Sequence, residues 1–410
     1  MKNRVVVTGA SGVTALGNTY KDIQLKLRQG KSAVVHMPEW EIFEGLHTKL
    51  AAPISDFTLP EHYDRKKIRS MGPVSKMATL ATENALIDAD LLGHDIIQSG
   101  ESGIAYGSCT GSTQPILSFV NMLNDHTTKG ITATTYIKMM SHTCAVNIGI
   151  FFGVRGRVIP TSSACTSGSQ GIGYAYESIK NGYQKVMIAG GAEELCPSEA
   201  AVFDTLFATS TKNSTPHLTP APFDKSRDGL VLGEGAATLI LEDLEHAKKR
   251  GGKIYAELVG YGTNCDAQHV THPDTHSMQR AMELALKDAG LQPKMIGYVN
   301  AHGTATEMGD IAESQAMWRL FGEKIPTSSL KSYYGHTLGA CGAIEAWLSI
   351  EMMNHSWFTP TLNLTEVDSR CGKLDYIMSE GRELNCDYVM SNNFAFGGIN
   401  TSLIFKRWHE

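Results

Sequence analysis

Residues 161–173 read Thr161-Ser-Ser-Ala-Cys165-Thr-Ser-Gly-Ser-Gln-Gly-Ile-Gly173, a turn of small residues that carries one cysteine. A strand-like Val-Ile-Pro precedes the turn, and a helical pattern follows it. Because the start of a helix stabilises an anion, we expect the pKa of Cys165 to fall from about 8.5 towards neutrality. The sequence therefore predicts a nucleophile at a strand-to-helix junction. A buried structural cysteine is the alternative, and it is the simpler interpretation for the other seven cysteines.

Short runs rich in Val and Ile alternate with longer helical patterns on both sides of this turn. They include residues 5–7, 186–191 and 236–242. Such alternation is typical of α/β proteins. Residue identities reveal no strong internal repeat, so any two-fold relationship within the chain must be structural.

A boundary near residue 252 divides the chain into an N-terminal half, 1–252, and a C-terminal half, 253–410. The strand pattern restarts beyond this boundary, and a helix is expected near 276–290. The segment 209–224, rich in Thr, Ser and Pro, predicts a long surface loop.

Composition limits the possible function classes. The net charge of −6 gives no support to a general nucleic-acid binder, and no apolar stretch approaches the ~20 residues of a membrane span. Eight cysteines without a Cys-x-x-Cys pair favour a reducing compartment. The N-terminus does not resemble a signal peptide, so we expect a cytoplasmic protein.

Two histidines occupy junctions like that of Cys165. His302 lies in Tyr-Val-Asn-Ala-His-Gly-Thr-Ala-Thr, and His336 in Leu-Lys-Ser-Tyr-Tyr-Gly-His, which also holds Lys331 and precedes a helix with Glu345. Open α/β sheets bind ligands at the ends of their strands. Either histidine alone is more often a hydrogen-bonded structural residue. Together with the cysteine, they predict a catalytic site.

Metal binding is the first alternative for this set. Cysteine and histidine are good zinc ligands, but these three lie far apart in the sequence and lack paired ligand spacing. We therefore expect no metal.

A turn near the C-terminus, residues 392–400, reads Asn-Asn-Phe-Ala-Phe-Gly-Gly-Ile-Asn. Gly397 and Gly398 permit unusual backbone angles, so a neighbouring N–H group could point at a developing oxyanion. An ordinary tight turn is the alternative.

A dehydrogenase is the strongest rival enzyme class. The glycines of residues 8–17 resemble a nucleotide-binding turn, and Ser163, Tyr176 and Lys180 resemble the Ser–Tyr–Lys set of short-chain dehydrogenases. The order of the glycines and the chain length disagree with that family.

In their order and spacing, the four segments around Cys165, His302, His336 and residues 392–400 resemble the β-ketoacyl-acyl carrier protein synthases of the thiolase superfamily. The resemblance is closest to the type II elongating enzymes and covers nearly the whole chain, including residues 222–236. It implies an α/β, five-layered αβαβα fold of two similar halves. It also implies a homodimer that condenses an acyl group with malonyl-acyl carrier protein, and a requirement for no cofactor beyond the carrier's own phosphopantetheine.

The resemblance also implies individual functions. Cys165 would accept the acyl group, and His302 and His336 would stabilise the malonyl enolate. The backbone N–H groups of Cys165 and Phe396 would form the oxyanion hole, and Phe396 would gate the site. The remaining implied residues are Lys331 and Glu345, which would order the site, and Thr304 and Thr306, which would hold the phosphopantetheine.

The acyl carrier protein is acidic, so we expect a basic docking patch, and residues 65–69 are the candidate. Its cations are Arg65, Lys66, Lys67 and Arg69. An ordinary solvated surface is the alternative.

Two residues depart from the family pattern. Thr110 stands where the elongating enzymes have a bulky apolar residue at the acyl pocket, and Ala395 stands between Phe394 and Phe396, where glycine is usual. These changes favour polyene or polyketide assembly as an alternative to fatty-acid elongation. A non-catalytic, chain-length-factor-like subunit is a further alternative, although such subunits typically lack the cysteine.

Overall fold

The computed structural model describes residues 2–409. Most of its strands belong to one sheet of eleven. The N-terminal half supplies β1 (Val5–Thr14), β4 (Ser102–Gly107), β5 (Val158–Thr161), β6 (Val186–Glu193) and β8 (Gly235–Asp243). The C-terminal half supplies β9 (Ala256–Cys265), β10 (Tyr298–Asn300), β11 (Pro326–Ser328), β13 (Asp375–Tyr376), β15 (Tyr388–Phe394) and β16 (Ile399–Arg407).

The two halves repeat one strand topology. The N-terminal strands run in the order β1-β8-β6-β4-β5, and the C-terminal strands in the order β9-β16-β15-β10-β11. In each half the first two pairings are antiparallel and the last two are parallel. The halves meet where β1 pairs antiparallel with β9. The expected two-fold relationship is therefore present in the structure although residue identities hide it.

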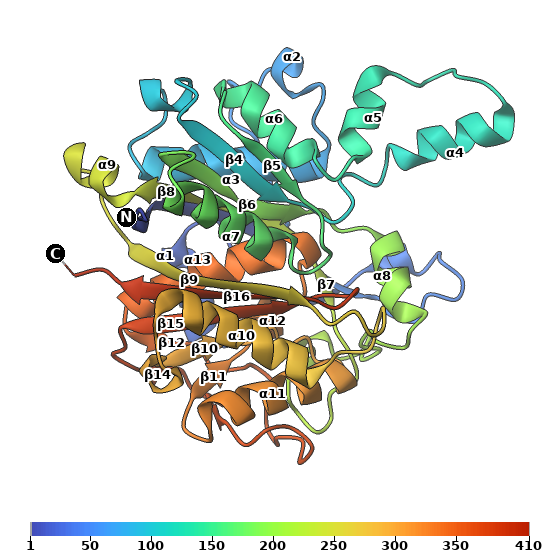
Figure 1. Ribbon diagram of the computed structural model, residues 1–410. Coiled ribbons are helices and arrows are strands. Elements are labelled where there is room, and N and C mark those ends of the chain that lie inside the picture. The colour runs from blue at the N-terminus through green and yellow to red at the C-terminus, as the bar shows by residue number, and fades with distance from the viewer. Residues whose placement is uncertain (1, 410) are drawn as a thin grey trace.

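Helices form three layers around the two halves of this sheet (Figure 1). The outer layers contain α3 (Pro73–Asp88) and α6 (Thr143–Phe152) on one side, and α10 (Thr275–Ala289) and α11 (Glu307–Phe321) on the other. Between the sheet halves lie α7 (Ser167–Lys180) and α13 (Cys341–Asn354). Almost every side chain of α13 is buried, as expected for a helix with sheet on both sides. These five layers confirm the predicted αβαβα fold.

Shorter elements complete the chain. The helices are α1 (Tyr20–Arg28), α2 (Arg65–Ile68), α4 (Ile116–Asp125), α5 (Ala133–Met139), α8 (Pro197–Asp204), α9 (Leu244–Lys249) and α12 (Lys331–Tyr334). The strands are β2 (Val35–His36), β3 (Leu50–Ala52), β7 (Leu232–Gly233), β12 (Trp357–Phe358) and β14 (Arg382–Glu383). In the described part of the chain, residues 2–409, no helix is long and apolar enough to cross a membrane.

Helices α4 and α5 form an arm that projects from the body of the molecule (Figure 1). Helix α4 has no buried residue. Large apolar side chains are exposed along the arm: Ile116, Leu117, Val120, Leu123 and Tyr136. A surface of this kind is typical of a protein–protein contact.

The glycine-rich segment near the N-terminus is a strand and not a nucleotide-binding turn. Gly9 and Gly12 both lie inside β1. A side chain at Gly9 would lie 2.4 Å from the carbonyl oxygen of Ala85 in α3, so this glycine allows helix and strand to pack closely. The segment therefore does not form the cofactor-binding loop that the dehydrogenase interpretation requires.

The predicted surface loop 209–224 is only partly at the surface. Its middle, including the short 3-10 helix Pro216–Leu218, is half-buried or exposed. Both ends are buried, and the Asp224 carboxylate accepts hydrogen bonds from the N–H groups of Thr365 and Glu366 at 2.7 and 3.0 Å. The prediction was wrong for these ends because Ser, Thr and Asp can be buried when they are hydrogen-bonded.

Candidate active site

The turn that carries Cys165 links β5 to α7 and is fixed by its own polar residues. The Ser167 hydroxyl accepts from the N–H of Ser163 at 2.9 Å and donates to the Ala164 carbonyl at 2.7 Å. Ala164 has a φ of +51°, a left-handed conformation that is rare and costly for a residue with a side chain. The sequence prediction of a cysteine at a strand-to-helix junction is confirmed.

Close backbone packing supports the turn. A Cβ at Gly191 in β6 would lie 2.4 Å from the carbonyl oxygen of Gly339 and 2.9 Å from the Cα of Gly168. Gly168 belongs to the first turn of α7, and Gly339 precedes α13. The two central helices therefore approach the sheet at a point where only glycines fit.

The Cys165 thiol has a raised pKa, contrary to the sequence prediction. Burial raises this pKa to about 11, and the Lys331 ammonium and the backbone N–H groups of Phe396 and Cys165 only partly oppose it. The prediction was wrong because it considered the helix start alone, whereas the thiol is almost fully buried. At neutral pH the resting thiol is protonated.

His336 contacts the Cys165 thiol through its ring. Its Nε2 lies 3.0 Å from Cys165 Sγ, and the backbone N–H of His336 donates to the Val231 carbonyl at 2.7 Å. Burial, together with the Lys331 ammonium, lowers the pKa of His336 well below its usual value, so the ring is neutral. Within residues 2–409, Nδ1 has no hydrogen-bond partner. Either tautomer is therefore accessible, and Nε2 can accept a proton and later donate one.

His302 has one tautomer, which Lys331 determines. Lys331 Nζ lies 3.1 Å from His302 Nδ1, and an ammonium can only donate. Nδ1 must accept, so Nε2 carries the proton. Burial, then the positive charge of Lys331, lowers the pKa of His302 well below its usual value and keeps the ring neutral. The rings of His302 and His336 lie edge to face, 5.1 Å apart.

A buried ion pair holds Lys331 in place. Its ammonium contacts the Glu345 carboxylate, which also accepts from the Asn393 amide at 2.6 Å. Burial disfavours the charged lysine, but the charge and hydrogen bond of Glu345, together with other nearby acidic groups, outweigh it, and the pKa of Lys331 is raised. Lys331 begins the short helix α12. Glu345 lies on α13 as expected.

The turn predicted at 392–400 is shorter in the structure: residues 395–398 connect β15 to β16 beside the thiol, because both flanking segments pair as strands. The backbone N–H groups of Phe396 and Cys165 lie close enough to Cys165 Sγ to lower its pKa, and they are the two donors expected for an oxyanion hole. Gly397 and Gly398 have φ values of +84° and +72°, so the expected unusual backbone is present. The Gly397 N–H donates to the carbonyl of Val270 at 2.7 Å, which ties the turn to a second loop.

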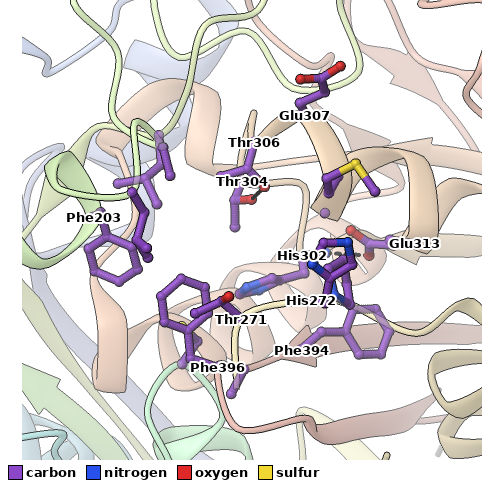
Figure 2. Close-up of a pocket in the computed structure, with 18 of the residues that line it drawn as sticks. Phe203, Thr271, His272, His302, Thr304, Thr306, Glu307, Glu313, Phe394 and Phe396 are labelled. Carbon is purple, nitrogen blue, oxygen red and sulfur yellow. Dashed lines mark hydrogen bonds between the residues drawn. The ribbon is translucent and has the colours of Figure 1, made fainter. Parts of the chain in front are cut away.

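A cavity of about 400 Å³ leads to these groups (Figure 2). Thr304 and Thr306 line it and hydrogen-bond to each other at 2.9 Å. Phe394 and Ala395 also line it. The Phe394 ring lies edge-on to His302 at 6.2 Å, and the Phe396 ring packs on Phe203 of α8 at 5.1 Å (Figure 2). The predicted residues from both halves of the chain therefore meet in one site.

Two sets of the predicted residues do not line this cavity. Thr110 does not line this cavity, and its hydroxyl donates to Glu199 on α8 at 3.2 Å. The basic residues 65–69 form α2 and its C-terminal end, with Asp64 as the N-cap, at the surface of the N-terminal half (Figure 1). They do not contribute to the cavity wall.

The geometry alone could accommodate a metal ion. Sγ of Cys165 and ring nitrogens of His302 and His336 lie within 4.8 Å of one another, although the sequence showed no metal-ligand spacing. The Lys331 ammonium beside His302 Nδ1 opposes a second cation at the same place. The expectation of a metal-free site stays a prediction.

Three residues at the site were not identified from the sequence. Glu313 accepts the N–H groups of His302 and Gly303, both at 2.7 Å, and Asn393 bonds Glu345. Cys341 Sγ lies 3.2 Å from the Cys165 carbonyl oxygen. Asn393 lies in the 392–400 segment, whereas no local sequence pattern distinguishes Glu313 and Cys341 from ordinary helix residues.

The chain matches one protein family over most of its length. Residues 2–247 match the β-ketoacyl synthase N-terminal domain, and residues 255–365 match the C-terminal domain of the same family. The 3-oxoacyl-acyl-carrier-protein synthase 2 of Synechocystis is 36% identical over 413 residues, with 99% of each chain covered. The enzyme of the same name from Vibrio cholerae is 37% identical over 414 residues, again with 99% of each covered.

Solved structures agree with this result. A β-ketoacyl synthase from Burkholderia phymatum superposes with a TM-score of 0.98 at 59% identity, covering 99% of this chain and all of the other. A type II polyketide ketosynthase bound to its acyl carrier protein has a TM-score of 0.87 at 30% identity, with both chains fully covered. From the domain matches, the full-length similarity and the Cys–His–His geometry, the chain belongs to the β-ketoacyl synthase family of condensing acyltransferases.

Proposed function

We propose that Cys165 accepts an acyl group from an acyl carrier protein and passes it to a two-carbon unit derived from malonyl-acyl carrier protein. The product is a 3-oxoacyl-acyl carrier protein. The observation that carries the proposal is the approach of His336 to Cys165, 3.0 Å from Nε2 to Sγ, beside the backbone N–H groups of Cys165 and Phe396. A nucleophile, a proton acceptor and an oxyanion hole are what acyl transfer needs.

The first half-reaction loads the enzyme. Nε2 of His336 accepts the thiol proton as Sγ attacks the thioester carbonyl, and the N–H groups of Cys165 and Phe396 stabilise the oxyanion. The bond between the acyl carbon and the carrier's sulfur breaks, and the proton passes to the leaving thiol. Because the resting thiol has a pKa of about 11, this proton transfer is required for attack at neutral pH.

The second half-reaction forms the carbon–carbon bond. Malonyl thioester loses carbon dioxide, and the electron pair remains on the adjacent carbon as an enolate. Nε2–H of His302, and Nε2–H of His336 once its thiol partner is acylated, stabilise the enolate oxygen. The carbanion attacks the acyl carbon, Cys165 leaves as the thiolate, and the thiolate takes up a proton. Lys331 and Glu345 set the tautomer and position of His302.

Substrates arrive on a carrier protein. Thr304, Thr306 and Phe396 line the cavity. The proposed role of the two threonines is to bind the phosphopantetheine arm, and that of Phe396 is to gate passage to Cys165. The exposed cations Arg65, Lys66, Lys67 and Arg69 are the proposed docking patch for an acidic carrier. No metal or further cofactor takes part in the proposed chemistry.

The proposed assembly is a homodimer. The exposed apolar side chains of the α4–α5 arm support this, since such a surface is costly to leave in water. We also propose a cytoplasmic location, where a catalytic thiol stays reduced.

The pathway is either fatty-acid elongation or the assembly of a polyene or polyketide. Thr110 and Ala395 support the specialised pathway, because they change the polarity and the backbone of the proposed acyl-binding region. The chain-length-factor-like alternative is not favoured, since Cys165, His302 and His336 are all in place and the relatives named above are synthases.

Reconstitution tests the proposal. Wild type and the Cys165→Ala variant would be incubated with acyl- and malonyl-loaded carrier protein, and 3-oxoacyl product and carbon dioxide would be measured. Product from the wild type alone supports the function, and the acyl group used most rapidly indicates the pathway. A folded wild type that forms no product with any acyl group would favour the non-catalytic subunit.

A further inference from the structure

Glu199 on α8 is a buried acid that no step of the proposed mechanism uses. Only 6% of its surface is exposed. Its Oε1 accepts from the Thr110 hydroxyl at 3.2 Å, whereas its Oε2 is buried and has no hydrogen-bond partner within residues 2–409. A buried carboxyl oxygen without a partner is costly, so its retention requires an explanation.

Glu193 on β6 is a neighbouring acid with full hydrogen bonding. Both oxygens of Glu193 are occupied: Oε1 accepts from Ser108 at 2.9 Å, and Oε2 from the N–H groups of Cys109 and Gly339 at 2.7 and 3.1 Å. Glu193 holds the 107–113 segment against the start of α13. By comparison, Glu199 accepts a hydrogen bond from one hydroxyl only, and its other oxygen has no partner within residues 2–409.

Glu199 lies near residues that surround the Cys165 thiol. Burial, and then the charges of Glu193, Cys165 and Glu199, raise the pKa of Cys109 well above its usual value. Phe203, one turn after Glu199 on α8, packs against the Phe396 ring. Phe396 lines the cavity and, like Cys109, packs against the apolar cluster that contains Phe203 and Leu338. Thr110 and Glu199 do not line the cavity; they lie behind this apolar layer, so an acyl group reaches them only when the proposed Phe396 gate opens.

The free oxygen of Glu199 is a hydrogen-bond donor at neutral pH. Burial, and then the charges of Glu193, Cys196 and Glu194, raise the pKa of this carboxyl to about 10. A protonated carboxyl donates one hydrogen bond through its O–H group. Its complement is an oxygen atom on the ligand, and a plain hydrocarbon chain offers none.

Resting on the proposed condensation, we infer that Glu199, supported by Thr110, is a specificity-determining residue. It selects an acyl group that carries a hydroxyl or carbonyl oxygen remote from the thioester. The apolar layer of Cys109, Phe203 and Leu338 contacts the carbon chain, and the carboxyl contacts the oxygen. A site built to hydrogen-bond a substrate oxygen discriminates strongly against the analogue that lacks it.

The test compares matched acyl groups on one carrier protein. Hexanoyl, octanoyl and decanoyl groups would be paired with the terminal-hydroxyl and penultimate-oxo derivatives of the same length. The acylation rate of Cys165 would be measured by intact mass. For at least one length, we expect the oxygenated member to react about ten-fold faster or more, the equivalent of one well-made buried hydrogen bond.

Variants at position 199 test whether Glu199 causes this preference. Glu199→Leu should remove the preference or reverse it, and Glu199→Gln, which keeps a donor, should retain most of it. Val202→Ala, an exposed position on the same helix, is the matched control and should behave as wild type. Thermal unfolding and size-exclusion chromatography of each variant show whether the fold and oligomeric state are retained.

Three outcomes would overturn the inference. The wild type could prefer the hydrocarbon at every length, or Glu199→Leu could keep the full preference. A folded Glu199→Leu variant could also lose its oligomeric state with selectivity unchanged, which would assign Glu199 to a subunit contact. If Cys165 accepted no acyl group at all, the proposed function would fail first, and this inference with it.

Discussion

The Cys165 thiol lies 3.0 Å from Nε2 of His336, and both groups are buried and neutral at rest. This differs from a pre-formed thiolate–imidazolium pair, because burial penalises both charged forms. Activation must therefore accompany substrate attack, when the proton moves to His336 and the oxyanion forms beside the N–H groups of Cys165 and Phe396.

The pH dependence of alkylation tests the raised pKa of Cys165. Since only the thiolate reacts and the pKa is about 11, the iodoacetamide rate at Cys165 should rise about ten-fold per pH unit from pH 7 to 9. Peptide mass spectrometry would follow Cys165, with exposed Cys265 as an internal record of reagent exposure. A rate that levels off below pH 8 would show that the thiol ionises near neutrality after all.

Substituting the two histidines one at a time should show which half-reaction each one supports. His302→Ala should leave acylation of Cys165 within a few-fold of wild type and lower malonyl decarboxylation by ~10²–10³-fold, because a preorganised donor to the enolate is lost. His336→Ala should slow both steps, since His336 also contacts the thiol. Released carbon dioxide and intact mass report the two steps independently. Equal loss of acylation and decarboxylation in His302→Ala would contradict the assignment.

The ion pair of Lys331 with Glu345 should be required for activity more than for stability. Glu345→Ala leaves a buried ammonium unpaired and should lower the free energy of unfolding by about 3–5 kcal/mol. The double variant Lys331→Met, Glu345→Leu should recover most of that stability and still decarboxylate malonyl thioester poorly, because nothing then fixes the His302 tautomer. Denaturant unfolding and decarboxylation assays would be run on all variants. Recovery of activity along with stability would show that the pair acts only as packing.

The glycine contact under the catalytic turn gives a stability prediction. Gly191→Ala would place a methyl group 2.4 Å from the Gly339 carbonyl oxygen, so the two central helices must shift, at a cost of about 1–3 kcal/mol or more. Gly149→Ala is the control, since Gly149 lies in α6 with its nearest contact at 3.4 Å, and alanine favours a helix. We expect a lower melting temperature for Gly191→Ala only. Equal melting temperatures would mean that the layers are less tightly packed than the structure indicates.

The sequence predicted the parts of the site that are local. Cys165 and His302 each sit in a short motif at a strand-to-helix junction, whereas His336 lies between α12 and α13 and not directly after a strand as expected. The alternating pattern predicted an α/β protein, and the resemblance to the family implied the αβαβα layers. The pKa of Cys165 could not be predicted this way, because burial comes from both halves of the chain. The Glu313 contact to the His302 backbone, the pairing of β1 with β9 and the strand at Gly9 likewise depend on tertiary packing.

The central claim is that Cys165 carries the acyl group. Its most direct test is the intact mass of the protein after incubation with acyl-loaded carrier protein and without malonyl groups, for wild type and Cys165→Ala. We predict that the wild type gains the mass of one acyl group per chain, that malonyl-carrier protein then removes it, and that the variant gains nothing. An equal gain on Cys165→Ala, or no gain on a folded wild type with any acyl group, would contradict the account.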